Sequence, residues 1–264
     1  MRFDANKNAE RFTGFAKVYD DARPKMPAYV TDVITKYLLH KPGVVVDLGC
    51  GTGLSTLAWH GKCNRAIGIE PSNDMLNIAM EKATNDTSFI KAFANNTTLD
   101  NEVADVVVCS QSFHWMEPIE TLCEVNRILK TDGVFATVDC DWPPICNWKA
   151  ELAYNELINA AKELLNHQNE KSAHQWDKNM HLYNIEQSGY FKYCREIVFC
   201  NREQSSAKRF IDLALSQGNL QTVLKTNPTT IASQIEEFQD KIENIFDKDF
   251  DIDFCYHMRI GVKV

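Results

Sequence analysis

Between residues 44 and 53 the chain reads VVVDLGCGTG, which places an aspartate shortly before three glycines at every second position. A glycine adopts positive φ angles easily, and its missing Cβ lets a ligand touch the backbone. Asp47 adds negative charge two residues before the first glycine, which suits a ligand with an ammonium group. The stretch predicts a binding turn for a nucleoside-type ligand without phosphate contacts, formed by Gly49, Gly51 and Gly53.

The spacing of these glycines separates two kinds of nucleotide site. A dinucleotide-binding turn has the pattern G-x-G-x-x-G, in which the third glycine lets the helix pack close to the strand beneath a pyrophosphate. Here the pattern is G-x-G-x-G, and Leu54 occupies the sixth position. The carboxylate of Asp47 would also lie close to a pyrophosphate and repel it. The spacing therefore disfavours a nicotinamide dinucleotide, and a degenerate site of that kind stays an alternative.

The segments around this turn have the pattern of a doubly wound α/β sheet. Residues 44–46 are a β-branched run typical of a strand that is covered on both faces, and residues 54–60 continue as a helix. Further strands are predicted over residues 65–70, 89–93, 103–109, 134–139 and 191–200, and alternation over 254–263 predicts a last, half-buried strand. Ligands of such sheets bind at the carboxyl ends of the strands.

The residues Asp47–Gly53, DLGCGTG, resemble motif I of the class I S-adenosylmethionine-dependent methyltransferases. The chain as a whole resembles their type-11, trans-aconitate-methyltransferase-like branch, most weakly over residues 142–190. The resemblance implies an α/β fold: a Rossmann-like, doubly wound, seven-stranded and mostly parallel sheet with an antiparallel last strand. It also implies S-adenosyl-L-methionine as the cofactor and S-adenosyl-L-homocysteine as the product.

Glu70 ends the second predicted strand, where a carboxylate can accept hydrogen bonds from both ribose hydroxyls of the cofactor. The resemblance places Met75 and Ala94-Asn95 at the adenine, although a core position is nearly as consistent for Met75. Asn95 departs from the family's acidic form, and its amide carbonyl can still accept from the adenine amino group. The expected cofactor-binding residues are Tyr19, Arg23, Asp47, Gly49, Gly51, Gly53, Glu70, Pro71, Met75, Ala94, Asn95 and Gln111.

The end of the fourth predicted strand carries the segment SQSFHW, residues 110–115. It resembles the Q-x-F-H-W segment that this branch places at the mouth of the active site. His114 is the candidate catalytic residue, since an imidazole that titrates near neutral pH can act as a general base. Trp115 is a candidate for stacking on the substrate, and a core position is equally consistent with it.

Two further segments are expected to enclose the substrate. Residues 1–41 contain F-A-x-V-Y-D-x-A-R-P and resemble the family's N-terminal helical lid, in which Tyr19 and Arg23 border the methionine end of the cofactor or the carboxylate of the substrate. Residues 142–190 are predicted to form a substrate cap, with Trp142 and Trp148 as candidate substrate contacts. A structural insertion with its own small core is the alternative. The whole chain, 1–264, is predicted to be one methyltransferase domain.

The composition and net charge of the chain limit the classes of partner that we expect it to bind. The 264 residues are 44% apolar and 24% charged, which suits one substantial α/β core, and the net charge of −8 lacks the basic footprint of nucleic-acid binders. We expect a small-molecule substrate, no nucleic-acid or membrane partner, and a monomer or homodimer. Nine cysteines without a C-x-x-C pair indicate free thiols in a reducing compartment, and the charged N-terminus lacks the apolar core of a signal peptide. A cytoplasmic location follows as the expectation.

No metal site is expected. His167, His174 and His181 recur every seven residues. Seven residues of helix rise about 10.5 Å, which is too far for two of these side chains to share one zinc ion.

Methyl transfer from a sulfonium is an in-line displacement in which the donor carries its own leaving group, so the protein mainly aligns the reactants and excludes water. We hypothesise a small-molecule methyltransferase that acts on a carboxylate, hydroxyl, amine or carbon acceptor. Arg23 would hold a carboxylate, and His114 would assist a hydroxyl or an amine. A non-catalytic S-adenosylmethionine-binding protein and, less favoured, a nicotinamide-dependent oxidoreductase stay as alternatives.

Overall fold

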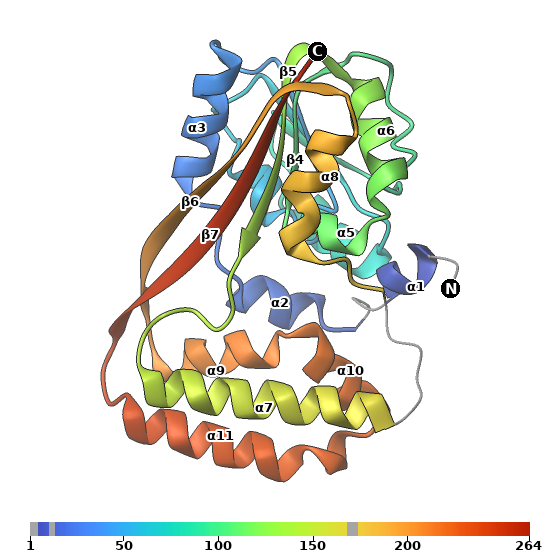
Figure 1. Cartoon of the computed structure of the whole chain (residues 1–264). Coiled ribbons are helices and arrows are strands. Elements are labelled where there is room, and N and C mark those ends of the chain that lie inside the picture. The colour runs from blue at the N-terminus through green and yellow to red at the C-terminus, as the bar shows by residue number, and fades with distance from the viewer. Residues whose placement is uncertain (1–4, 11–13, 168–173) are drawn as a thin grey trace.

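A computed structural model describes residues 5–10, 14–167 and 174–264. Seven strands form one sheet in the order β3-β2-β1-β4-β5-β7-β6, which confirms the predicted Rossmann-like architecture (Figure 1). The bounds of the strands are β1 Val44–Leu48, β2 Arg65–Ile69, β3 Thr87–Ile90, β4 Ala104–Ser110, β5 Leu129–Cys140, β6 Phe191–Ser205 and β7 Phe250–Lys263.

The first five strands of the sheet are parallel, whereas β7 runs antiparallel to both β5 and β6. The centre of β1 is fully buried, and Val46 lies opposite Ile67 on one side and Val107 on the other. This burial explains the unbroken β-branched run, because a parallel strand is covered on both faces. The carboxyl ends of β1, β2, β3 and β4 consequently meet at one edge.

The strands β5 and β6 each extend five residues or more beyond their predicted bounds. β5 begins at Leu129 rather than at residue 134, because Leu129 pairs with Ala104 before an irregularity, after which Val106 pairs with Val134. β6 continues past residue 200 to Ser205, where it pairs with Phe250 at the start of β7. In both cases the extension depends on a partner strand that is distant in the sequence.

Helices cover both faces of the sheet (Figure 1). One face is covered by α3, and the opposite face by α6 and α8; short α4 and α5 follow β1 and β2, and α1 and α2 precede the sheet. The bounds are α1 Ala5–Glu10, α2 Ala16–Ala22, α3 Ala28–Leu38, α4 Leu54–Leu57, α5 Asn73–Glu81, α6 Pro118–Ile128 and α8 His181–Gln187. Short 3₁₀ helices lie at Phe113–Trp115, Lys178–Met180 and Pro228–Thr230.

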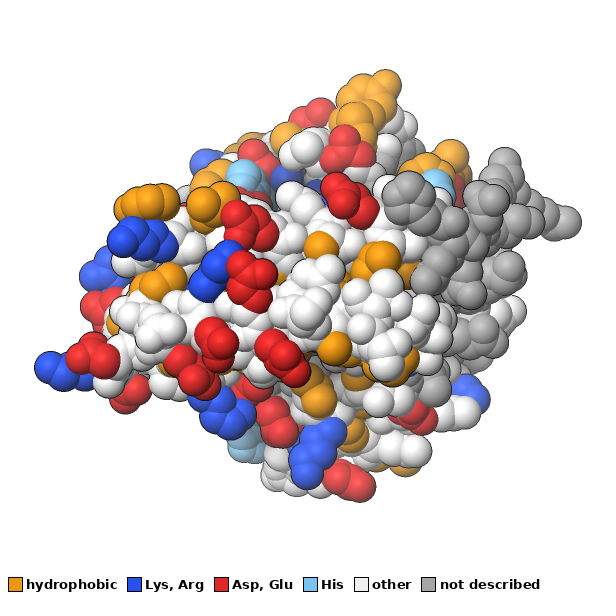
Figure 2. Space-filling model, turned by 90° about the horizontal axis from the view of Figure 1, so that it is seen from below, with side chains coloured by type: hydrophobic (Ala, Val, Ile, Leu, Met, Phe, Trp, Pro, Cys, Tyr) orange, Lys and Arg blue, Asp and Glu red, His pale blue; other side chains and the backbone are white. Residues whose placement is uncertain are grey.

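A separate layer of helices lies beyond the end of the sheet, below α2 in Figure 1. It contains α7 Trp148–His167, α9 Ala207–Leu215, α10 Gly218–Thr226 and α11 Ala232–Ile245. α7 packs against α10 and α11, and Lys241 on α11 forms an ion pair with Glu156 on α7 at 3.2 Å. Figure 2, seen from the side of this layer, shows acidic and basic side chains interspersed.

The segment 142–190, predicted as one cap, is divided between two places in the fold. α7 belongs to the helical layer with α9, α10 and α11, whereas α8 contacts β6, β7 and α6. Its function as a substrate cap stays a prediction. Within the described residues, no helix combines the length and the apolar character that a membrane crossing requires.

Candidate functional site

A pocket opens where the carboxyl ends of the parallel strands meet the N-terminal helices. Its wall combines the glycine turn after β1, the end of β2, the segments that follow β3 and β4, and residues of α1 and α2. Of the residues predicted from the sequence, those that line it are Tyr19, Arg23, Gly49, Gly51, Glu70, Pro71, Met75, Ala94, Asn95, Gln111, Trp115 and Trp142. The sequence analysis missed other lining residues, among them Asn8, Thr52, Thr121 and Tyr256.

The three glycines of the turn all have positive φ angles, of 67° at Gly49, 56° at Gly51 and 84° at Gly53, so each uses the left-handed region that favours glycine. A Cβ at Gly51 would meet no atom within 4 Å, which leaves its backbone open to the pocket. A Cβ at Gly53 would lie 2.9 Å from the Phe89 ring. Gly51 therefore faces the open pocket, whereas Gly53 lies outside the pocket lining and permits close packing against β3.

Asp47 lies beneath the turn and is fully buried. One of its carboxylate oxygens accepts hydrogen bonds from Ser55 Oγ at 2.6 Å and Thr56 Oγ1 at 2.7 Å, and both hydroxyls belong to α4. Burial raises the pKa of Asp47 to about 6. Asp47 does not line the pocket, and the contact that the structure shows for it is with the start of α4.

Glu70 lies in the pocket wall directly after β2 and is 6% exposed. Its two carboxylate oxygens accept hydrogen bonds from the backbone N–H groups of Gly51 at 3.0 Å and Ser72 at 2.8 Å. Burial raises its pKa to about 7 despite these two bonds. A carboxylate oxygen has a second lone pair, so both oxygens keep the capacity to accept from a ligand hydroxyl.

Beyond Glu70 the wall is formed by Pro71, Met75, Ala94 and Asn95. Met75 is buried, so it serves the core and the pocket wall at once. The Asn95 side-chain NH₂ donates to Glu120 at 2.7 Å. The amide carbonyl of Asn95 then remains as an acceptor.

Gln111 follows β4 and adopts a φ of 56°, which is uncommon for a residue other than glycine. Its Oε1 lies 3.4 Å from Nζ of Lys178, whereas its buried Nε2 has no hydrogen-bond partner in the described part of the chain. A buried donor without a partner is costly in the free protein. This donor belongs to a residue of the pocket wall, where a ligand can satisfy it.

Arg23 lies between two aromatic rings at the other side of the pocket. Its guanidinium carbon is 4.8 Å from the centre of the Tyr19 ring and 4.5 Å from that of Trp142. Its Nε and Nη2 atoms donate to the hydroxyl and the carbonyl of Ser216, each at 3.0 Å. Among the described residues, no carboxylate lies within ion-pair distance of Arg23, which leaves its charge unbalanced at the pocket wall.

Trp115 and Trp142 line the pocket, but Trp148 does not. Trp148 is 69% exposed at the start of α7, with the ammonium of Lys149 over its ring. The predicted contact between Trp148 and the substrate therefore has no support from the lining of this pocket.

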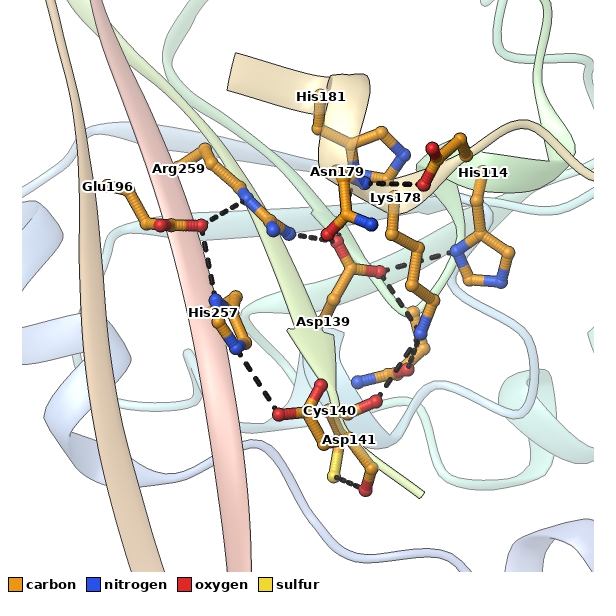
Figure 3. Close-up of polar contacts among 12 residues, drawn as sticks. His114, Asp139, Cys140, Asp141, Lys178, Asn179, His181, Glu196, His257 and Arg259 are labelled. Atoms are coloured by element: carbon orange, nitrogen blue, oxygen red, sulfur yellow. Dashed lines mark hydrogen bonds and ion pairs between the residues drawn. The ribbon is translucent and has the colours of Figure 1, made fainter. Parts of the chain in front are cut away.

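His114 also lies outside the pocket lining, and only 4% of it is exposed. Its Nδ1 atom is 3.3 Å from Asp139 at the end of β5. The same carboxylate contacts Arg259 at 3.0 Å and His181 at 2.9 Å, and Lys178 Nζ is 3.6 Å away (Figure 3). The imidazole of His114 therefore faces a buried ionic cluster.

The pKa values in this cluster are shifted in opposite directions. Burial lowers the pKa of His114 to about 4, so its imidazole is neutral at neutral pH. Burial alone would raise the pKa of Asp139, but hydrogen bonds from His114 and His181 and the charge of Lys178 hold it well below its usual range. Of the residues in this cluster, His114 alone was predicted as a site residue, although Asp139 ends the predicted strand 134–139 and so carries a sequence signal.

Within the described residues, no group of three histidine, cysteine or acidic side chains is placed to hold a metal ion. The side chain of His167 lies outside the described residues, and His181 contacts Asp139 instead. The nine cysteines are free thiols.

Comparison with known proteins agrees with this geometry. Residues 46–137, which run from within β1 through the glycine turn to within β5, match a family model described as a methyltransferase domain. These residues belong to a class I S-adenosylmethionine-dependent methyltransferase domain. The methyltransferase domain has a relative in Saccharomyces cerevisiae, described as a probable S-adenosylmethionine-dependent methyltransferase. It is 33% identical over 138 residues, which cover 50% of this chain and 45% of that protein.

Solved structures share the fold of this chain over most of its length. One, from Anaeromyxobacter dehalogenans and described only as a candidate type II methyltransferase, has a TM-score of 0.67 and 15% identity, covering 91% of this chain and 97% of the other. Geranyl diphosphate C-methyltransferase from Streptomyces coelicolor, solved with S-adenosyl-L-homocysteine, has a TM-score of 0.50 and 14% identity, covering 90% and 78%. At these identities the likeness shows the fold, and the chain spans about half the length of the curated relatives it matches.

Proposed function

We propose that this protein is an S-adenosyl-L-methionine-dependent methyltransferase that transfers the methyl group in line to a small-molecule acceptor. The observation that carries the proposal is the relation between Gly51 and Glu70. The open backbone of Gly51 and the buried carboxylate of Glu70 share a hydrogen bond on the wall of one pocket. That pairing suits a ribose ring, which needs an acceptor for two hydroxyls and a backbone without a Cβ beside it.

The pocket offers residues suited to the ribose, the adenine and the methionine part of the cofactor. Glu70 would accept from the ribose, and Met75, Ala94 and Asn95 would lie against the adenine. The unpartnered Nε2 of Gln111 would donate to the methionine part of the ligand. When bound, the cofactor supplies a methyl group on a positively charged sulfur. Asp47 would act indirectly, by fixing α4 and the glycine turn through Ser55 and Thr56.

The other side of the pocket favours an acceptor with a negatively charged group. The guanidinium of Arg23 is held by Tyr19, Trp142 and Ser216, and no ion pair within the described residues neutralises it. Such a rigid guanidinium binds a carboxylate well, because its remaining N–H groups are already oriented. The faces of Trp115 and Trp142 would contact the rest of a small acceptor. The net charge of −8 also supports a small molecule over a nucleic acid.

The protein's own contribution to the reaction would be alignment and exclusion of water. Holding two reactants in line can contribute roughly 7 to 11 kcal/mol to lowering the barrier. A carboxylate acceptor is already ionised and needs no base. For a hydroxyl or an amine, His114 stays the candidate base from the sequence, but its lowered pKa of about 4 makes it a weak base and its side chain lies outside the pocket lining. Both features favour an acceptor that needs no base.

The first experiment is calorimetric titration of the protein with S-adenosylmethionine, S-adenosylhomocysteine and, as a control, NADH. Binding of the first two without NADH is expected. Small carboxylates, phenols and amines would then be screened for methyl transfer by mass spectrometry. Binding of the cofactor without turnover of any acceptor class would favour a non-catalytic binding protein. Binding of NADH alone would overturn the proposal.

A further inference from the structure

Two cysteines face each other across the pair of long strands that joins the sheet to the helical layer (Figure 1). Cys200 on β6 lies directly opposite Cys255 on β7 in the antiparallel register. Directly opposite residues project their side chains to the same face of a sheet. The two thiols are therefore neighbours, although 54 residues separate them in the sequence.

The hydrogen bonds of β7 define the type of this pair. The carbonyl of Cys255 accepts from the backbone N–H of Asp141, on the β5 side of the strand, and Asp253 exchanges both of its backbone bonds with Ile145 on that side. The N–H and C=O of one strand residue point to the same side, so those of Cys255 point away from β6. Cys200 and Cys255 thus form a non-hydrogen-bonded pair, the type with the shorter Cα separation of about 4.5 Å.

That separation is compatible with a disulfide, which needs a Cα distance between about 4.4 and 6.8 Å. The thiols also differ in their surroundings. Cys200 is exposed, whereas Cys255 is half-buried. Burial and contact with the Cys200 thiol raise the pKa of Cys255 to about 12. An oxidant would therefore reach Cys200 first, and Cys255 would be the thiol that resolves the product.

A competing partner for Cys255 is absent among the described residues on this face. Cys140 on β5 lies opposite Tyr256, so its side chain projects to the other face of the sheet, and it is buried. Tyr256 stacks on Phe199 on that face, with ring centres 5.2 Å apart. The sheet itself separates the exposed thiol pair from the pocket wall.

We propose that Cys200 and Cys255 are a modification site, at which a peroxide converts the two thiols into a reversible cross-strand disulfide. In the first step the O–O bond of the peroxide breaks, a bond from oxygen to the Cys200 sulfur forms, and water leaves. In the second step the Cys255 sulfur displaces the hydroxyl from the Cys200 sulfenic acid, and the thiol proton leaves with it as a second water. The two thiols lose two electrons together, and the peroxide accepts them.

The disulfide would close a covalent ring around the segment that carries α9, α10 and α11. Both ends of that segment would then be tied together at the edge of the sheet. A cross-link of this kind restricts the unfolded chain and raises stability. The oxidised protein is therefore expected to have a higher Tm than the reduced protein.

The test uses the full chain, fully reduced and then treated with hydrogen peroxide, denatured, and alkylated with N-ethylmaleimide. Compared with the reduced protein, the intact mass should fall by two hydrogens before alkylation, and two fewer thiols should be alkylated afterwards. Peptide mapping should show one cross-linked peptide that joins Cys200 to Cys255. Dithiothreitol should restore both thiols. Alkylation of both cysteines after peroxide, or a cross-link between other cysteines, would overturn the proposal.

Two variants separate the roles of the thiols. Cys255→Ser should leave a sulfenic acid on Cys200 that a dimedone probe traps, whereas Cys200→Ser should give no cross-link. Cys123→Ser is the matched control, because Cys123 is an exposed thiol on α6. That variant should form the disulfide to the same extent as the unmodified sequence, and failure to do so would also contradict the assignment.

Discussion

The carboxylate of Glu70 accepts one backbone N–H from Gly51, at 3.0 Å, and another from Ser72, at 2.8 Å. Gly51 belongs to the turn after β1, and Ser72 precedes α5. One buried side chain thus fixes the two turns that flank the proposed ribose site. Because burial raises its pKa to about 7, the charge of this side chain changes close to neutral pH.

Replacement of Glu70 by glutamine should weaken cofactor binding and remove a pH dependence. The ionised carboxylate accepts charge-assisted hydrogen bonds from ribose hydroxyls, each contributing about 1.5–3 kcal/mol, so we expect affinity to fall roughly 10- to 100-fold at pH 8. In the unmodified protein, affinity for S-adenosylmethionine should rise as the pH increases through about 7. Calorimetry at pH 6 and pH 8 measures both effects. Glu117→Gln, which changes another acid of the pocket wall, serves as the control and should retain most of the affinity.

Alanine at Gly51 and alanine at Gly53 should have different effects. Both positions have positive φ, so each variant is strained by roughly 1–2 kcal/mol. At Gly51 the added Cβ meets no protein atom and occupies ligand space, so cofactor affinity should fall about tenfold or more. At Gly53 the Cβ collides with Phe89, which adds about 1–3 kcal/mol of instability. Thermal melts and calorimetry on both variants provide the comparison, and a larger loss of stability at Gly51 would contradict it.

Arg23→Lys should impair the acceptor site more than the cofactor site. A lysine keeps the charge but loses the planar group that stacks on Tyr19 and Trp142 and bonds twice to Ser216. Once an acceptor is known, its KM should rise about tenfold, with cofactor affinity within about twofold. Ser216→Ala removes one of the two contacts with Ser216 and should have a smaller effect in the same direction. An unchanged KM in both variants would remove Arg23 from the acceptor site.

Asp139→Asn should destabilise the fold in a pH-dependent way. At neutral pH the variant takes one of two carboxylate partners from the buried Arg259, which keeps Glu196 at 2.8 Å, and we expect a loss of about 1.5–3 kcal/mol. The pKa of Asp139 is depressed in the folded protein, so its contribution is present above its unfolded pKa and is lost as the pH falls. The difference between the variant and the unmodified protein should therefore shrink below about pH 4. Urea unfolding at pH 7 and pH 3 tests this, and a difference that is the same at both pH values would contradict it.

The site residues that directly follow a strand could be predicted from the sequence. The glycine turn, the acid after β2 and Gln111 after β4 each follow a strand with an unbroken apolar run, and parallel strands bring their carboxyl ends together. The seven-stranded, mostly parallel sheet with its antiparallel last strand followed from the same pattern together with the family resemblance, whereas the strand order was not predicted. Ten of the twelve predicted cofactor residues line one pocket, and whether they bind the cofactor stays a prediction.

The remaining parts depend on contacts between distant segments. Nothing in the sequence beside His114 indicates that His181 and Arg259 contact the same buried carboxylate, that of Asp139, because the four residues come from four separate elements. Trp142 and Trp148 are six residues apart, yet one lines the pocket and the other is mostly exposed, since Trp148 is the first residue of α7, which belongs to the helical layer. Ser216 carries no motif, and its role follows only from the position of α9 next to α2.

The hydrogen bonds from Arg23 to Ser216 join residues that are 193 positions apart in the chain. By contrast, nearly all of the proposed cofactor contacts lie between Gly49 and Gln111, within the segment that matches the methyltransferase model. The two halves of the pocket are thus encoded separately. A chimera that receives residues 46–111 from a relative should exchange the donor half and keep its acceptor preference, because Arg23, Trp115, Trp142 and Ser216 all lie outside the exchanged segment.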